Sequence, residues 1–139
     1  MIKIVVLFGT ILISLTAFSK QPMRPFTPGA LCSEQDPDFM GYRYQARVAY
    51  CKRNVSHAKK LKIARAYGIP ESEWKNYEFD HLIPLNAGGS SRVENLWPEP
   101  IDEARSKDQV EKRTFEGLSR GTLTQDEAVQ MIWDWVALH

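Results

Sequence analysis

Apolar residues recur at helical spacing in the first half of the 139-residue chain. Leu61, Ala64 and Tyr67 fall on one face of a helix. Ser56 stands before them as a helix N-cap. Together, these positions predict a helix that ends at Tyr67 before a glycine stop signal.

Two further helices are predicted in the C-terminal part of the chain. Residues 102–117 are polar nearly all round, with Asp102 as N-cap and Gly117 or Gly121 as stop signals. Residues 122–139 begin with a capping box. Apolar positions at core spacing follow the box: Val129, Ile132, Trp133 and Val136. The last helix is therefore expected to be a structural buttress.

A hairpin is predicted over residues 77–100, after a short helix in which a tryptophan packs inward. Its first strand is the apolar run 79–85, residues 86–91 form a Gly-Gly turn cluster, and two prolines stop a second short apolar segment. Asp80 and His81 are neighbours in the first strand, so their side chains point to opposite faces. The two side chains cannot both be buried in one core unless the strand is twisted or its ends open into a functional site.

These elements predict an α+β fold, a small single domain in which helices surround one hairpin. Residues 1–19 resemble a secretory signal peptide, with Lys3 before an apolar run and small residues before a cut at Lys20. An uncleaved membrane anchor is the alternative, although the run is short for a membrane span. The domain is then 20–139, with 20–76 as a helical part that contains the cysteines. The protein is expected to be periplasmic or secreted, without membrane contact after cleavage.

Cys32 and Cys51 are the two cysteines of the chain. In an exported protein they are expected to form a disulfide, which stabilises by about 3 kcal/mol in the chain-entropy model. Two free thiols, or a redox or metal pair, are the alternatives, although the spacing is far from Cys-x-x-Cys. Because the pair lies outside the hairpin, its reduction is expected to lower the melting temperature without touching the site.

The charge of the chain is balanced, with 18 basic and 17 acidic residues. Lys3 is the only charged residue of the signal peptide, so the mature domain has no net charge before histidine is counted. A neutral nucleic-acid binder must concentrate positive charge locally. Six basic residues and no acidic residue lie between positions 52 and 65. Phosphate contact through Lys59 and Lys62 is one interpretation, and a solvated helix face is the other.

Several residue pairs of the hairpin segment carry a family resemblance: Asp80-His81, Pro84-Leu85, Gly88-Gly89 and Asn95-Leu96. This pattern resembles the HNH endonuclease family, the ββα-metal or His-Me finger nucleases. The similarity covers residues 77–112, about a quarter of the chain. It is closest to a branch of small bacterial proteins with Lys-Asp and Glu on the next helix, here Lys107, Asp108 and Glu111.

The resemblance implies metal-dependent hydrolysis of phosphodiester bonds in nucleic acid. A neutral imidazole can take the proton of an attacking water, and His81 fits that role. A hard divalent cation, Mg²⁺ or Mn²⁺, neutralises charge on the phosphate and the departing oxygen, and Asp80 is its expected ligand. In the resembled family the residue at the position of Asn95 steadies the loop that holds the base, or binds metal. The loop role is favoured here.

At the third position of the family's motif, this chain differs from the usual family pattern. It falls on Glu103 or Ala104, and alanine cannot bind metal, so Glu103 is the expected second ligand. Asp108 and Glu111, one or two turns further along the same helix, are alternatives. The cysteine pairs that hold structural zinc in many family members are missing.

The chain is therefore predicted to be an exported endonuclease that cuts DNA or RNA without sequence specificity. Arg105 and Lys107 are further expected nucleic-acid contacts. The rival hypothesis is a non-enzymatic nucleic-acid-binding or structural protein on a decayed HNH scaffold. The sequence does not decide between DNA and RNA, or between single-stranded and double-stranded substrates. It also does not identify the metal, the biological role or the oligomeric state.

Overall fold

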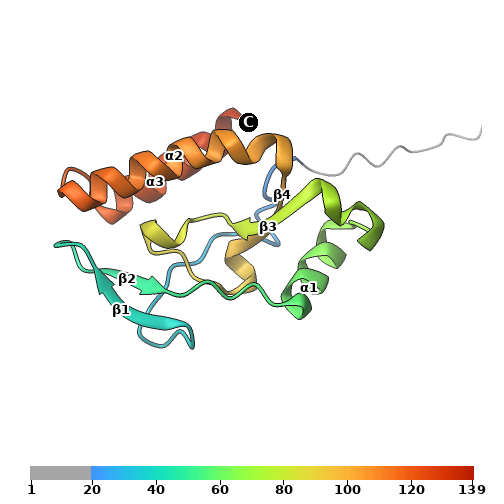
Figure 1. Ribbon diagram of the computed structural model, residues 1–139, viewed down its shortest axis with the longest axis horizontal. Helices are drawn as coiled ribbons and strands as arrows, with labels where there is room; N and C mark the ends of the chain where they lie inside the picture. Colours follow the sequence, from blue (N-terminus) through green and yellow to red (C-terminus); the bar gives the residue numbers. More distant parts are fainter. Residues whose placement is uncertain (1–19) are drawn as a thin grey trace, which may run out of the picture.

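The computed structural model of the protein describes residues 20–139, and the predicted signal peptide lies outside the described residues. The described chain forms one small α+β domain, as predicted (Figure 1). Its elements are β1 (Phe39–Arg43), β2 (Val48–Cys51), α1 (His57–Tyr67), a 3₁₀ helix (Glu71–Asn76), β3 (Tyr77–His81), two 3₁₀ turns (Leu85–Ala87 and Val93–Asn95), β4 (Leu96–Pro100), α2 (Ile101–Arg120) and α3 (Gln125–Leu138). The β3–β4 hairpin lies in the middle, with α1 on one side and the paired helices α2 and α3 on the other.

The antiparallel pair β3–β4 is the predicted hairpin, with Asp80 opposite Trp97 and His81 opposite Leu96. Contrary to the prediction, β4 continues through its two prolines instead of stopping at them. In a two-stranded sheet each strand is an edge strand, and proline is tolerated there because its missing N–H can face away from the partner. Helix α2 begins directly after β4, so hairpin and helix form a ββα unit.

The main hydrophobic core joins the hairpin to the helices. Leu96 and Trp97 of β4 have no exposed surface. Their neighbours in the core come from α1 (Ile63, Ala64, Tyr67), α2 (Val110) and α3 (Ile132, Trp135). Complete burial of one large apolar side chain is worth about 1.5–3 kcal/mol. This cluster therefore fixes β4, and with it the ββα unit, between the helices.

The predicted ends of α1 and the start of α3 are confirmed. The Ser56 hydroxyl accepts from the backbone N–H of Lys59, and Gly68 ends α1 in the left-handed region at φ 69°. Thr124 and Glu127 form the capping box of α3. Within α3 the deeper tryptophan is Trp135, whereas the predicted core residue Trp133 is half-buried.

Helix α2 differs from its prediction at its start, and it ends at the second of the two predicted stop signals. It begins at Ile101, so Asp102 lies in its first turn and is not the N-cap. Gly117 does not stop it, because the absence of a side chain there makes room for the packing of Leu123. The helix ends instead at Gly121, in the left-handed region at φ 70°.

The N-terminal part, 20–76, is not only helical, because it contains the hairpin β1–β2. The predicted disulfide Cys32–Cys51 is confirmed, with the two Cα atoms 5.7 Å apart. It ties the last residue of β2 to the N-terminal segment, which also bridges to Gly89 in the loop after β3. In the part of the chain from residue 20 onward, no helix is long and apolar enough to span a bilayer.

Candidate functional site

Asp80 and His81, at the end of β3, line a polar hollow of about 340 Å³. The loop at 84–86 and Glu111 of α2 also line it, as do groups from the β1–β2 hairpin. The hollow therefore brings the predicted acid–imidazole pair together with side chains from three other parts of the chain. Although the two residues are neighbours in a strand, Nδ1 of His81 lies 3.4 Å from Oδ1 of Asp80.

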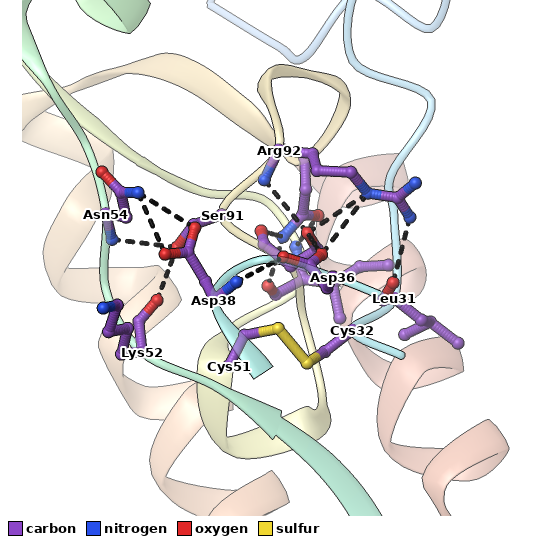
Figure 2. The surroundings of a disulfide bond; sticks show 12 residues. Leu31, Cys32, Asp36, Asp38, Cys51, Lys52, Asn54, Ser91 and Arg92 are labelled. Carbon is purple, nitrogen blue, oxygen red and sulfur yellow. Dashed lines mark hydrogen bonds and ion pairs between the residues drawn. A yellow bond between two sulfur atoms is a disulfide. The ribbon is translucent and has the colours of Figure 1, made fainter. Parts of the chain in front are cut away.

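The ring of His81 is held by the hydroxyl group of Ser91. Nε2 of His81 lies 2.9 Å from Oγ of Ser91. That hydroxyl donates to the backbone carbonyl of Lys52 over 2.9 Å and accepts from the backbone N–H of Asn54 over 3.0 Å. Figure 2 shows Ser91 between Lys52 and Asn54, close to the disulfide.

These contacts assign the tautomer of His81. The hydroxyl of Ser91 has one proton, and the Lys52 carbonyl can only accept it. Ser91 Oγ must then accept from Nε2–H of His81, which leaves Nδ1 of the neutral ring without a proton. A proton taken up at Nδ1 would face the carboxylate of Asp80, which stabilises the imidazolium that forms. The arrangement is that of a general base with Nδ1 as the basic atom.

Asp80 is held in its ionised form. Arg53 donates to Oδ1 over 2.7 Å, and the ammonium of Lys107 donates to Oδ2 over 3.3 Å. Burial raises the pKa of this carboxyl, but the charge of Lys107, the hydrogen bond from Arg53 and the backbone N–H of His81 outweigh burial and hold the pKa below its usual range. The carboxylate therefore carries its charge at any pH at which the protein would act.

Lys107 lies inside the protein, a position that does not fit the expected contact with nucleic acid. The side chain is 1% exposed. Its ammonium donates to the carbonyl of His81 and to Glu111, each over 2.6 Å, and lies 3.7 Å from Glu99. Burial lowers the pKa of Lys107, but the surrounding carboxylates raise it above its ordinary value. The ammonium thus acts as an internal cation that positions carboxylates around the site.

Asn95 is completely buried and closes the loop that follows His81. Its Oδ1 accepts from the backbone N–H of Ile83 over 3.0 Å. Its Nδ2 donates to the carbonyls of Ile83 and Ser90 over 2.8 and 2.9 Å. All these bonds are to the backbone, so the amide side chain determines the shape of the loop that carries Ser91.

The second carboxylate of the hollow is Glu111, not the predicted Glu103. Glu103 lies near the start of α2 and does not line the hollow with Asp80 and His81, whereas Glu111, two turns further on, does. Burial raises the pKa of Glu111 and the ammonium of Lys107 opposes that rise. Within residues 20–139, no three or more His, Cys, Asp or Glu side chains are grouped so as to hold a metal ion.

The other predicted phosphate contacts have mixed placements. Lys59 is half-buried, and its ammonium donates to the carbonyls of Asn54 and Ser91 over 2.8 and 2.7 Å. It therefore braces the Ser91 loop, whereas the sequence offers a phosphate contact as one interpretation of this residue. Lys62 on α1 and Arg105 on α2 are exposed, and neither lines the hollow.

Sequence reasoning missed Ser91 and the specific part played by Arg53. Arg53 belongs to the basic cluster between positions 52 and 65, but its pairing with Asp80 spans 27 residues. Ser91 follows the Gly-Gly turn, where a serine indicates only a loop. The contact between Ser91 and His81 can be seen only in the folded structure, because no local spacing in the sequence indicates it.

Comparison of the chain with known protein families, with curated proteins and with solved structures returned no match.

Proposed function

We propose that the protein is an exported, metal-dependent endonuclease of HNH type that hydrolyses phosphodiester bonds of nucleic acid without sequence specificity. The observation that carries the proposal is the pairing of His81 with Ser91, which leaves Nδ1 free to accept a proton inside a polar hollow. The placement of this pair at the end of β3, in a hairpin followed directly by α2, supports the same class.

In this proposal each residue at or near the hollow has its own role in hydrolysis. Nδ1 of His81 takes a proton from the attacking water. Asp80 stabilises the imidazolium that results, over the 3.4 Å that separates the two side chains. Arg53, half-exposed beside Asp80, offers a guanidinium to the phosphate. Asn95 keeps the intervening loop in place so that Ser91 continues to hold the ring.

The residues present fit a hard divalent cation such as Mg²⁺ or Mn²⁺. Such ions keep several waters and require only one or two protein carboxylates together with substrate phosphate. Asp80 and Glu111 both line the hollow, and they would hold the ion. When bound, the cation neutralises charge on the phosphate and the departing oxygen.

One observation favours the rival, a nucleic-acid-binding or structural protein without activity. The ammonium of Lys107 already lies 3.3 Å from Asp80 and 2.6 Å from Glu111, so a positive charge is present between the two carboxylates that would bind the cation. If no divalent ion competes with that ammonium, the hollow contains a general base but no cation that neutralises the charge on the substrate phosphate.

A cleavage assay separates the two functions. Purified protein is incubated with plasmid DNA and with RNA, in Mg²⁺, in Mn²⁺ and in chelator. We expect cleavage in either metal, none in chelator, and a loss of about 10²- to 10⁴-fold in His81→Ala, because the general base is removed. His139→Ala, which changes an exposed histidine after α3, is the matched control and should cleave like wild type.

The same assay locates the second carboxylate. Glu111→Ala is expected to raise the metal concentration needed for half-maximal cleavage, whereas Glu103→Ala, on the same helix but outside the hollow, should not. A wild-type protein that cleaves neither nucleic acid in any metal would establish the non-enzymatic alternative.

A further inference from the structure

A second hollow, of about 610 Å³, adjoins the one that contains Asp80 and His81. Arg53 and Glu78 line both hollows. The guanidinium of Arg53 marks the boundary, because one of its nitrogens donates to Asp80 over 2.7 Å and the other to the carbonyl of Phe79 over 3.3 Å. A chain molecule bound at Asp80 can therefore continue past Arg53 into the second hollow.

The second hollow is lined by aromatic rings. Trp74, Tyr77 and Phe79 all contribute, from the 3₁₀ helix and from β3. The rings of Trp74 and Phe79 meet edge to face, with centroids 5.0 Å apart. Ile101, the first residue of α2, adds an apolar side chain that is 55% exposed. Trp74 and Tyr77 are partly exposed there, whereas Phe79 is 6% exposed and belongs to the core, so the rings that a ligand can reach are those of Trp74 and Tyr77.

The rim of this hollow is positively charged. Lys60 and Lys75 line it, and the ammonium of Lys60 lies 5.9 Å from the centre of the Phe79 ring. With Arg53 they supply three positive groups, against one carboxylate, Glu78. Aromatic faces beside basic side chains are the combination that binds bases and phosphates of unpaired nucleic acid.

We propose that this hollow, called here the base subsite, takes an unpaired base of a nucleotide next to the phosphate that is cut. The inference builds on the proposed function and narrows its substrate to single-stranded DNA or RNA. A base inside a duplex is stacked on both faces and paired at its edge, so it cannot enter a hollow lined by Trp74, Tyr77 and Phe79. A base in a single strand can turn out and stack on Trp74 or Tyr77.

Cleavage and binding of matched strands test this inference. A mixed-sequence DNA strand, its RNA equivalent and the DNA strand annealed to its complement are each cut by wild type, and their binding is measured with His81→Ala. We expect single strands to be bound and cut at least tenfold better than the duplex. Trp74→Ala should weaken single-strand binding by about tenfold, as expected for one lost stacking partner, and Trp74→Phe should retain most of it.

Two further readouts keep the test independent of the folding of Trp74→Ala. Lys75→Gln changes an exposed side chain and should reduce the salt dependence of single-strand binding by about 0.7 in the log–log slope, whereas Lys112→Gln on α2 should leave binding to the base subsite unchanged. A strand that carries 5-bromouracil should photocrosslink to a peptide that contains Trp74 or Tyr77.

The outcomes for the subsite and for the proposed function differ. A wild type that cuts duplex as fast as single strands, with no effect of Lys75→Gln and no crosslink at Trp74 or Tyr77, overturns the base subsite and leaves the nuclease. A protein that crosslinks there and binds single strands without cutting them supports the subsite and overturns the nuclease. A protein that binds no nucleic acid overturns both.

Discussion

At the scale of single residues, the hydroxyl of Ser91 decides which nitrogen of His81 can accept a proton. Its own proton is directed to the Lys52 carbonyl, and one lone pair is filled by the N–H of Asn54. The other lone pair then requires Nε2–H of His81. One buried serine, with no part in the chemistry itself, therefore sets the protonation of the atom that faces Asp80.

We predict that Ser91→Ala lowers kcat by about 10- to 100-fold, the usual cost of losing a group that orients a functional histidine. KM should change little, because Ser91 is buried and touches no substrate. The measurement is steady-state cleavage as a function of substrate concentration. Ser90→Ala is the control, since Ser90 is equally buried but bonds to Asp36 and not to His81. A Ser91→Ala protein with the kcat of wild type would contradict the assigned tautomer.

The residue pair at the site could be predicted from the sequence, but its supporting charges could not. Asp80 and His81 are conspicuous because an acid and an imidazole interrupt an apolar strand. Lys107 sits on a helix that is polar nearly all round, where a lysine indicates a solvated face. Its burial arises because Asp80, Glu111 and the carbonyl of His81 converge on it from β3 and from its own helix. The spacing of these residues along the sequence does not indicate that they converge on Lys107.

At the scale of elements, the helices were predictable because their signals are local, and the hairpin β1–β2 was not. Caps and apolar spacing indicate α1 and α3 within a few residues. The turn of β1–β2 instead has Tyr44 and Arg47 in the left-handed region, at φ 61° and 52°. Glycine or asparagine usually occupies such positions, so the sequence has no turn signal there.

The disulfide belongs to the element that supports the site, which argues against the expectation that reduction leaves the site untouched. Cys51 ends β2, and the next residue, Lys52, supplies the carbonyl that orients Ser91. We predict that Cys32→Ala/Cys51→Ala loses about 3 kcal/mol of unfolding free energy in the chain-entropy model. We also predict a lower kcat at temperatures where the variant is still folded. Thermal melts and cleavage rates measure the two effects.

Treatment with a reductant provides the control for that prediction. It should reproduce both effects in wild type and add nothing in the double variant. If reduced wild type melts at a lower temperature but cleaves with unchanged kcat below that temperature, the disulfide stabilises the fold without positioning Ser91.

At the scale of the whole molecule, the balanced charge of the chain is divided between interior and surface. Lys59 and Lys107 place their ammonium groups inside, where they hold backbone carbonyls and carboxylates. Lys75 remains exposed and Lys60 partly exposed, beside the aromatic hollow, and Arg53 joins that hollow to the site. Exposed positive charge therefore lies along the path proposed for a nucleic-acid chain, although the overall composition is not basic.

The buried charges also make the stability of the whole domain depend on pH, chiefly through Glu99. This side chain of β4 is 2% exposed, and one of its oxygens has no hydrogen-bond partner within the described structure. Burial raises the pKa of Glu99 to about 8 from 4.5, although Lys107 opposes the rise. The folded domain thus keeps a proton at neutral pH that the unfolded chain has released.

We predict that Glu99→Gln is stabilised relative to wild type as the pH rises from 5 to 9. The pKa of Glu99 is higher in the folded protein than in the unfolded chain, so the free energy of unfolding of wild type falls between about pH 4.5 and pH 8. The fall is at most about 1.4 kcal/mol per pH unit. The amide that replaces Glu99 in the variant cannot ionise, so the variant lacks this fall. Melting temperatures of both proteins across this range measure the effect. Glu71→Gln, which changes an exposed glutamate of the 3₁₀ helix, should give a curve parallel to wild type. Parallel curves for Glu99→Gln and wild type would instead mean that Glu99 is already ionised in the folded protein and fully balanced by Lys107.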